Sequence, residues 1–237
     1  MKTIVGIIPA RGGSKTIPRK NVQPFLGKPL IAWTIESALN SQVLDRVIVS
    51  TEDEEIAGIA QEYGAEVPFL RPDGLAHNST PLIKVILHAI DWLESQDQMP
   101  DGIMMLSPTN PLRAPEDIQA AVRMVRENNA VSVASMFQPS TNPYACGFVT
   151  RGGTVFGVPL MNRKDQRHQS LPSFMALNGA IYLASPSTFR ETKALITHSS
   201  QIYTMPPERA IEVITPWDFY MAELVMRDRL AQSQEQS

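Results

Sequence analysis

Hydrophobic and polar positions along the first half of the chain alternate between the periods of strands and helices. Short apolar runs predict strands at residues 3–8, 46–50, 66–70, 102–106 and 130–135. Between these runs, apolar residues recur at helical spacing, most clearly over 81–95. The run over 102–106 is continuously apolar, which is typical of a central parallel strand. The alternation predicts an α/β fold with a mostly parallel, doubly wound sheet covered by helices on both faces.

Capping patterns mark the ends of the predicted helices. Residues 51–54 (TEDE) form a capping box that opens one helix, and Gly64 ends that helix at its C′ position. Pro81 takes the first position of the following helix. Thr215 caps a closing amphipathic helix over 216–230.

The region from about 136 to 172 departs from this alternation. Gly152 and Gly153 predict a hairpin turn between strands at 144–150 and 154–156, and no long helix is evident. We therefore expect a small β-hairpin excursion from the domain.

One domain is expected to span residues 1–230. A strand over 178–184 returns the chain to the sheet after the excursion. The polar residues 231–237 are expected to form a disordered tail.

Composition narrows the possible functions. The chain of 237 residues has a net charge of −3 and no long basic run, so neither a nucleic acid polymer nor an anionic membrane surface is an expected partner. Its single cysteine excludes an intrachain disulfide and fits a reducing compartment. No apolar stretch approaches the roughly 18 residues of a membrane helix, so we expect a cytoplasmic protein with no membrane partner. The histidines show no metal-ligand spacing.

The most informative segment is the loop after the first strand, within residues 7–21 (IIPARGGSKTIPRKN). Its adjacent glycines allow a tight turn that directs N–H groups at an anion. Cationic side chains flank them at Arg11, Lys15, Arg19 and Lys20. The segment matches neither GxxxxGK(S/T) nor GxGxxG. It predicts a polyphosphate site, and the alternative is a solvated basic turn.

Two further polar segments follow predicted strands. Arg71 follows the strand at 66–70, and the residues SPTNPLR at 107–113 follow the strand at 102–106. Ligands of parallel sheets gather at the carboxyl ends of strands, so we expect both segments to meet the first loop at one edge of the sheet.

These segments resemble the motifs of the acylneuraminate cytidylyltransferases, which make CMP-activated nonulosonic (sialic-type) sugars. The matching segments are RGGSK (11–15), IPRKN (17–21), LRP (70–72), SPTNPLR (107–113) and NGAIY (178–182). They occur in the family's order, and the resemblance covers roughly residues 3–225. It implies a Rossmann-like nucleotidyltransferase that uses CTP and Mg²⁺ and forms a homodimer through the hairpin excursion.

The implied reaction is the attack of a hydroxyl of a 2-keto-3-deoxy sugar acid on the α-phosphorus of CTP, with release of pyrophosphate. Such a transfer needs positioning and neutralisation of phosphate charge more than covalent catalysis. The resemblance gives the catalytic roles to the first loop: Arg11 and Lys15 would hold the β- and γ-phosphates, and Lys20 would reach the α-phosphate. Backbone N–H groups would come from Gly12, Gly13 and Ser14. The alternative for Lys20 and Arg19 is surface charge.

The resemblance also assigns the recognition of the base. Asn21 would match the pyrimidine or its ribose, and Arg71 would donate to cytosine in a planar fork. The alternative for Arg71 is a surface salt bridge to Asp73. Ser79 and Thr80 would contact the nucleotide or only cap the helix that follows them.

The sugar pocket is implied to involve Ser107, Thr109, Arg167, Gln169, Asn178 and Tyr182. Arginine suits this pocket because the guanidinium of Arg167 can form a bidentate pair with the acceptor's carboxylate. The alternative for Tyr182 is a core aromatic on its strand.

The chain departs from the family at the expected metal site. The family pattern Asp-Ile-Asp-Thr reads Glu212-Val213-Ile214-Thr215 here, so Glu212 is the one remaining carboxylate for Mg²⁺. Strand alternation would put Ile214 on the same face as Glu212, and the alternative is that Ile214 packs in the core.

Ser107 and Ala176 replace a glutamine and an arginine of the family's sugar pocket, which indicates an acceptor other than N-acetylneuraminate. Three hypotheses remain open. The first is a cytidylyltransferase that activates a nonulosonate. The second is a nucleotidyltransferase with another base or a sugar-phosphate acceptor. The third is a non-catalytic nucleotide-binding relative with a degraded metal site, which Ile214 favours and the complete cationic loop opposes.

Overall fold

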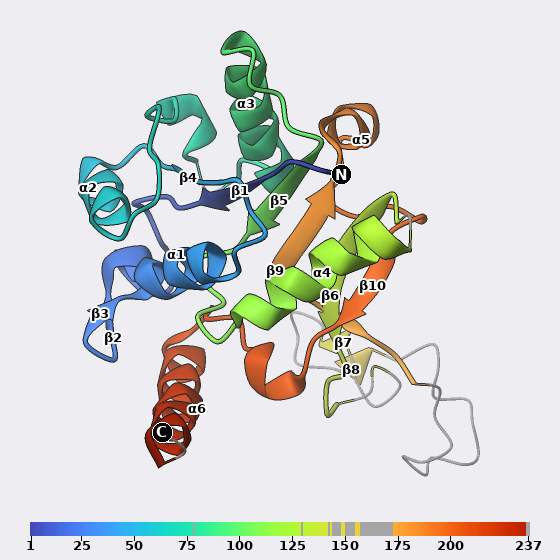
Figure 1. Cartoon of the computed structure of the whole chain (residues 1–237). Helices are drawn as coiled ribbons and strands as arrows, with labels where there is room; N and C mark the ends of the chain where they lie inside the picture. The colour runs from blue at the N-terminus through green and yellow to red at the C-terminus, as the bar shows by residue number, and fades with distance from the viewer. Residues whose placement is uncertain are drawn as a thin grey trace.

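The computed structural model describes residues 1–77, 79–128, 130–141, 143, 148–149, 155–156 and 173–235. Their central element is a six-stranded sheet in the order β10-β6-β9-β5-β1-β4 (Figure 1). The strands are β1 (Ile4–Pro9), β4 (Arg46–Ser50), β5 (Gly102–Leu106), β6 (Ser132–Phe137), β9 (Ala176–Ala184) and β10 (Gln201–Thr204).

The sheet is mostly parallel, as predicted. β1 pairs in parallel with β4 and β5, and β10 pairs in parallel with β6. β9 runs antiparallel to both of its neighbours, β5 and β6. Because β9 is reversed, its first residues lie at the edge where β5 and β6 end.

The strand predicted over 66–70 is wrong. This segment forms only isolated parallel bridges with β4, from Ile48 to Glu66 and from Thr51 to Leu70. Pro68 has no N–H to donate to a ladder, which explains why regular pairing is interrupted between these bridges.

Helices cover both faces of the sheet (Figure 1). They are α1 (Leu30–Asn40), α2 (Glu54–Glu62), α3 (Leu82–Ser95), α4 (Pro115–Glu127), α5 (Pro186–Thr192) and α6 (Pro216–Glu235). Successive residues of β1 alternate between the two layers. Ile4 and Ile8 share a core with α1, α2 and α4, whereas Val5 and Ile7 share a core with α3 and α5.

Two predicted helix starts need correction. The N-cap of α2 is Asp53, whose carboxylate accepts a hydrogen bond from the Ile56 N–H at 3.1 Å, and not Thr51. Pro81 is the N-cap of α3 and not its first residue, and no side chain caps this helix. Ser79 and Thr80 therefore do not act as its caps. Gly64 has a φ of +89°, as its predicted place after the helix requires.

The closing helix is capped as predicted but is longer. The Thr215 hydroxyl accepts from the Asp218 N–H at 3.3 Å, while Asp218 accepts from the Thr215 N–H at 2.7 Å. α6 continues to Glu235, so the predicted disordered tail does not begin at residue 231. Neither glycine nor proline follows Pro216 to stop the helix.

The predicted excursion is described only in part. β7 (Phe148–Val149) and β8 (Val155–Phe156) pair antiparallel, as in the predicted hairpin, whereas the predicted turn at Gly152 and Gly153 lies outside the described residues. The connection begins and ends at one point of the sheet, because Phe137 at the end of β6 pairs with Ala176 at the start of β9. A role of the hairpin in dimerisation stays a prediction.

A third, smaller apolar cluster joins α6 to the start of α1. It contains Phe25, Leu30 and Leu112 together with Val213 and Met226. The short antiparallel pair β2 (Pro24–Phe25) and β3 (Lys28–Pro29) leads into α1 beside it. Within the part of the chain that the structure describes, no helix combines the length and apolar character needed to cross a membrane.

Candidate active site

A cavity of about 270 Å³ lies at the carboxyl edge of the sheet, between the loops after β1 and β5. Its lining comprises Pro9, Arg11, Gly13, Ser14, Lys20, Asn21, Leu82, Ser107, Pro108 and Thr109. Seven of these residues are predicted site residues, from segments separated by more than 80 positions in the sequence. The predicted convergence of the first loop with the 107–113 segment is therefore confirmed.

The shape of the first loop depends on hydrogen bonds between its backbone groups and two side chains. The Gly12 N–H donates to Glu52 Oε1 at 2.8 Å, and the buried Asn21 donates through Nδ2 to the Arg11 carbonyl at 2.9 Å. A Cβ at Gly12 would collide with the Asp53 carboxylate, so a larger residue here would force the Asp53 side chain, the N-cap of α2, to move. Gly13 has open space around it and lines the cavity.

The hydrogen bond of the Gly12 N–H requires a correction to the predicted anion site. The Gly12 N–H is already bonded to Glu52, so it does not point freely at a ligand as predicted. Gly13 and Ser14, which line the cavity, remain placed to offer N–H groups. Lys15 is exposed and outside the lining of this cavity.

Arg19 has a structural role. Its guanidinium forms ion pairs with Asp53 and Glu55 at the start of α2. The same contacts hold the pKa of the Asp53 carboxyl below its usual range, because the Arg19 guanidinium stabilises the charged form. Arg19 adopts a left-handed conformation, with a φ of +54°, which turns the loop towards α2.

Lys20 reaches the cavity with its ammonium group anchored on one side. Nζ donates to the Val213 carbonyl at 2.8 Å and to the Ile214 carbonyl at 3.3 Å. An ammonium has three donors, so one remains for a ligand. Burial lowers the pKa of Lys20, the nearby Arg11 charge lowers it further, and the Glu212 carboxylate opposes this shift.

Asn21 and Arg71, the predicted base-reading residues, are both buried. Among the described residues, Asn21 Oδ1 has no hydrogen-bond partner. Arg71 pairs with Glu52 through Nη2 and Oε2 at 2.5 Å, and its Nε has no partner among the described residues. The alternative salt bridge to Asp73 is not formed, because the described ion pair of Arg71 is with Glu52.

The 107–113 segment presents a pair of hydroxyls to the cavity. Ser107 Oγ and Thr109 Oγ1 lie 2.8 Å apart, and both residues line the cavity. Beneath them, the buried Arg113 donates through Nη1 to the Ser107 carbonyl at 3.1 Å and to the Ala180 carbonyl at 3.0 Å. Asn110 donates to the Asn178 carbonyl at 3.0 Å. These bonds tie the segment to the start of β9.

Glu212 lies beside this hydroxyl pair. Burial raises the pKa of its carboxyl, while the Lys20 charge and a hydrogen bond from the Thr109 side chain partly offset the rise. A Cβ at Gly179 would stand 3.5 Å from Glu212 Oε2, and Gly179 has a φ of +70°. The carboxylate therefore packs over the backbone at the start of β9.

The segment around Ile214 is not a strand, but the predicted alternation holds over its three residues. Val213 is buried, whereas Glu212 is half-buried and Ile214 is 51% exposed. The alternative that Ile214 packs in the core is therefore wrong. Asp218, one turn into α6, accepts hydrogen bonds from the Ile214 and Thr215 N–H groups at 3.1 and 2.7 Å.

Asn178 and Tyr182 do not line the cavity. The Asn178 side chain is buried and bonded to protein atoms, since Oδ1 accepts from Ser135 Oγ at 2.6 Å and Nδ2 approaches Met205 Sδ at 2.9 Å. Tyr182 is 8% exposed and belongs to the core under α3 and α5. Burial raises the pKa of its hydroxyl, and the Glu212 charge adds to this rise.

Two other pairs of predicted site residues are not found among the described residues that line the cavity. Ser79 and Thr80 precede Leu82, which lines the cavity, but neither lines it. Arg167 and Gln169 lie outside the described residues. Among the described residues, no group of three or more histidine, cysteine, aspartate or glutamate side chains could hold a metal ion.

Comparisons with known proteins agree with this geometry. Residues 5–146 match the cytidylyltransferase family. The CMP-N,N'-diacetyllegionaminic acid synthase of Legionella pneumophila is 33% identical over 94% of this chain and 96% of its own length. The chain belongs to the cytidylyltransferase family. The predicted resemblance to its acylneuraminate-type members is therefore confirmed.

Other cytidylyltransferases extend this similarity. The pseudaminic acid cytidylyltransferase of Campylobacter jejuni is 32% identical over 93% of this chain and 95% of its own length. The N-acylneuraminate cytidylyltransferase of Escherichia coli is 28% identical over 95% of this chain but only 52% of its own length. A solved CMP:2-keto-3-deoxy-manno-octonic acid synthetase, complexed with CTP, has a TM-score of 0.71 at 17% identity, covering 96% of this chain and 99% of that one. This last likeness shows a shared fold.

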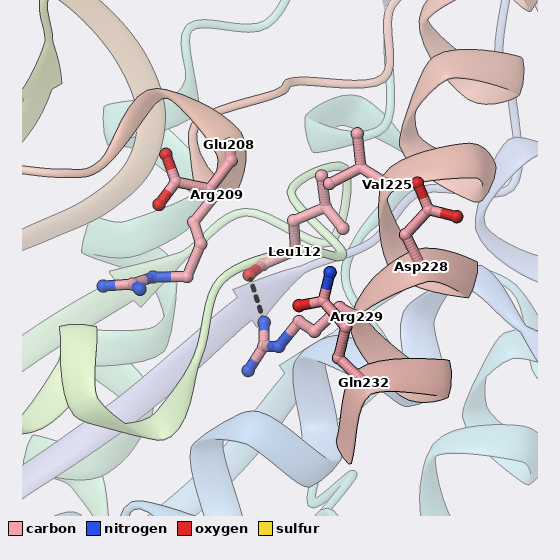
Figure 2. A pocket seen from close by; sticks show the side chains of 7 residues that line it. All are labelled: Leu112, Glu208, Arg209, Val225, Asp228, Arg229 and Gln232. Atoms are coloured by element: carbon pink, nitrogen blue, oxygen red, sulfur yellow. Dashed lines mark hydrogen bonds between the residues drawn. The ribbon is translucent and has the colours of Figure 1, made fainter. Parts of the chain in front are cut away.

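A larger cavity of about 380 Å³ in this cytidylyltransferase lies away from these residues, between the 3₁₀ turn at Pro207–Arg209 and α6 (Figure 2). Its two arginines are engaged by the protein. Arg209 pairs with the buried Asp117 at 2.8 Å, and Arg229 donates to the Leu112 carbonyl at 3.1 Å. Glu208 and Asp228 balance their charge, so the cavity has no built anion site.

Sequence reasoning missed three site residues of this cytidylyltransferase. Glu52 lies inside the TEDE pattern, which by itself predicts only a helix cap. Arg113 ends a quoted motif, but nothing in the sequence shows that its side chain is buried. Asp218 could have been found from its spacing after Thr215, since a capping-box acid lies three residues beyond its cap.

Proposed function

We propose that this protein transfers CMP from CTP to a 2-keto-3-deoxy sugar acid of the nonulosonate class and releases pyrophosphate. The observation that carries the proposal is the single cavity that joins the cationic loop after β1 to the hydroxyl pair after β5. Two relatives that are 32–33% identical and match over at least 95% of their own length are named for legionaminic and pseudaminic acids, which supports this acceptor class.

The phosphate end of the reaction falls to the first loop. Arg11 and Lys20 line the cavity, and Gly13 and Ser14 lie between them with backbone N–H groups. Their positive charge would balance the triphosphate and stabilise the pyrophosphate as it leaves. The third donor of Lys20 would serve the α-phosphate, where charge develops as the acceptor oxygen bonds to phosphorus and the bond to the β-phosphate oxygen breaks. Exposed Lys15 would fold over the outer phosphates.

The base would be read at the other end of the loop. Asn21 Oδ1, which has no hydrogen-bond partner among the described residues, can accept a hydrogen bond from the amino group that distinguishes cytosine from uracil. Arg71 pairs with Glu52 through Nη2, and in the described part of the chain its Nε has no hydrogen-bond partner. Ser79 and Thr80, at the entrance to α3, remain candidates for the ribose.

The acceptor would lie against the 107–113 segment. Ser107 and Thr109 offer hydroxyls, and Arg167 and Gln169 are proposed partners for the acceptor's carboxylate. Serine and alanine at positions 107 and 176 leave more room than the family's glutamine and arginine. We therefore expect an acceptor whose substituents differ from those of N-acetylneuraminate.

Magnesium is proposed as the cofactor, with Glu212 as its protein ligand. The described residues offer no cage of three acids, which fits an ion held by one carboxylate, phosphate oxygens and water. When bound, Mg²⁺ would neutralise phosphate charge. Glu212 is a half-buried carboxylate that interacts with Lys20 and with the Thr109 side chain, two residues of the cavity lining.

The magnesium assignment is tested with two substitutions. Glu212→Gln should raise the Mg²⁺ concentration needed for half-maximal turnover about tenfold or more. Ile214→Asp should lower that concentration, and because Ile214 is exposed the new carboxylate should cost less than about 0.5 kcal/mol of stability. An unchanged Mg²⁺ response in Glu212→Gln would mean that Glu212 is not a ligand and that the nucleotide alone holds the ion.

The whole proposal is tested by pyrophosphate release with CTP, UTP, ATP and GTP against a panel of keto-sugar acids. Turnover should require CTP and a nonulosonate. Turnover with another base or with a sugar phosphate would favour a different nucleotidyltransferase. Binding of CTP without turnover on any acceptor would favour a non-catalytic protein, the hypothesis that Ile214 supports.

A further inference from the structure

We infer that Glu52 is a positioning residue that couples the loop holding the triphosphate to the arginine assigned to the base. The inference rests on the proposed function, since it assigns a role within the same nucleotide site. Glu52 follows β4 by two residues and precedes α2, at a position that the TEDE pattern predicts only as part of a helix cap.

The two oxygens of Glu52 are bonded to two different segments of the site. Oε1 accepts from the Gly12 N–H at 2.8 Å, and Oε2 accepts from Arg71 Nη2 at 2.5 Å. Gly12 begins the phosphate loop, whereas Arg71 lies almost 60 residues further along the chain. One carboxylate therefore fixes both partners relative to each other.

Backbone hydrogen bonds bring the same segments together at the end of β4. The Ala10 N–H donates to the Ser50 carbonyl at 3.0 Å, and the Arg71 N–H donates to the Thr51 carbonyl at 2.7 Å. These bonds place the segments side by side but leave the direction of the Arg71 side chain and of the Gly12 peptide unset. Glu52 supplies that direction.

Burial makes this link strong. The side chain of Arg71 is 3% exposed and that of Glu52 is 16% exposed. A guanidinium in this setting, with Nε unpaired among the described residues, has Glu52 as its described charge partner. Loss of one member of a buried pair leaves the other charge uncompensated, so Arg71 would reorient.

The negative charge of Glu52 makes it possible to distinguish a positioning role from a simple electrostatic effect on ligand affinity. A carboxylate beside a polyphosphate site repels the ligand, so its neutralisation alone would tighten binding of any polyphosphate. If Glu52 positions the loop, neutralisation should weaken binding instead. The two effects have opposite directions and are separable in one measurement.

The experiment measures the affinity of the full-length protein by calorimetry for CTP and for magnesium tripolyphosphate, which has no base. Glu52→Gln should weaken both ligands, by about tenfold to a hundredfold, because misplacement by an ångström is costly. Glu54→Gln is the matched control: it removes the same charge from the same helix start, at an exposed side chain with no hydrogen bond or ion pair among the described residues, and it should change neither affinity more than about twofold. Equal or tighter binding of tripolyphosphate by Glu52→Gln would overturn the inference.

A second pair of variants covers the case in which Glu52→Gln does not fold. Glu52→Asp keeps the charge but is one methylene too short to span both partners, so it should lose affinity for both ligands. Arg71→Gln should weaken tripolyphosphate although Arg71 is assigned to the base. Normal tripolyphosphate binding in both folded variants would overturn the coupling. Failure of the wild type to bind CTP would instead overturn the proposed function.

Discussion

Arg113 shows how a buried charge can shape a loop without touching a ligand. Its guanidinium lies beneath the 107–113 segment, and burial lowers its pKa to about 10. Nε and Nη2 have no hydrogen-bond partner among the described residues. The carbonyls that it contacts have second donors, since Thr34 Oγ1 lies 3.3 Å from the Ser107 carbonyl and the Ser107 N–H lies 3.3 Å from the Ala180 carbonyl.

These contacts lead to a prediction that separates the packing of the Arg113 side chain from its charge. Arg113→Met should reduce the free energy of unfolding by less than about 1 kcal/mol, because it removes two unpaired donors and fills most of the space. Arg113→Ala should cost about 3 kcal/mol because it leaves a cavity. Urea denaturation measures both, and equal losses in the two variants would show that the guanidinium itself stabilises the fold.

Lys15 is the opposite case, a charge with no hydrogen bond or ion pair in the described part of the chain. It is exposed and lies between the cavity-lining Ser14 and the rest of the phosphate loop. Lys15→Ala should reduce turnover with CTP about a hundredfold or more through lost phosphate stabilisation, with an unchanged melting temperature. Lys2→Ala, an exposed lysine at the chain start, is the control. Near-normal turnover in Lys15→Ala would remove this side chain from the mechanism.

At the scale of elements, the start of α2 anchors the phosphate loop. Asp53 caps the helix through the Ile56 N–H and also pairs with Arg19 of the loop. Glu55 pairs with the same arginine. This helix start therefore does two tasks, one local and one between segments far apart in sequence.

The lowered pKa of Asp53 gives this anchor a pH dependence. A carboxyl whose folded pKa lies below its unfolded value stabilises the fold above the unfolded pKa, and it loses that contribution as the pH falls through the folded pKa. Asp53→Asn keeps a side-chain cap but loses the charge that pairs with Arg19, so it should cost about 0.5–1 kcal/mol at pH 7. The difference between wild type and variant should shrink below about pH 4. Urea denaturation at both pH values measures it, and a constant difference would mean that the charge is irrelevant.

Elements were predictable where the pattern is local. The apolar run at 102–106 and the glycine after α2 each depend on neighbours in sequence, and both predictions are confirmed. The strand predicted over 66–70 failed because one proline, Pro68, outweighs a β-type pattern. The reversed direction of β9 is set by the sheet as a whole and leaves no local signal.

The site was predictable to the same extent. Motif spacing located the loop after β1 and the segment after β5, whose residues meet in one cavity. It could not show which polar groups are already bonded within the protein. The Asn178 side chain contacts Ser135 and Met205, and the Gly12 N–H donates to Glu52. These partners lie in strands and loops that are distant in sequence, so motif spacing gives no sign of them.

At the scale of the molecule, the remaining expectation is a homodimer. Light scattering coupled to gel filtration should give about twice the 26.2 kDa of one chain. The mass should stay the same when the sample is diluted about tenfold, as for a stable interface. A monomeric mass that supports full turnover would show that one chain contains the complete site.

The point where β6 and β9 meet has a consequence for how such enzymes diversify. Phe137 and Ala176 are paired, so the chain between them departs from the sheet and rejoins it at a single position, on the edge that carries the cavity. All six strands of the central sheet lie outside that stretch, so its length and sequence can vary without a change in their order or register. Because this stretch contains Arg167 and Gln169, the proposed partners of the acceptor's carboxylate, we expect differences in acceptor preference between relatives to concentrate there.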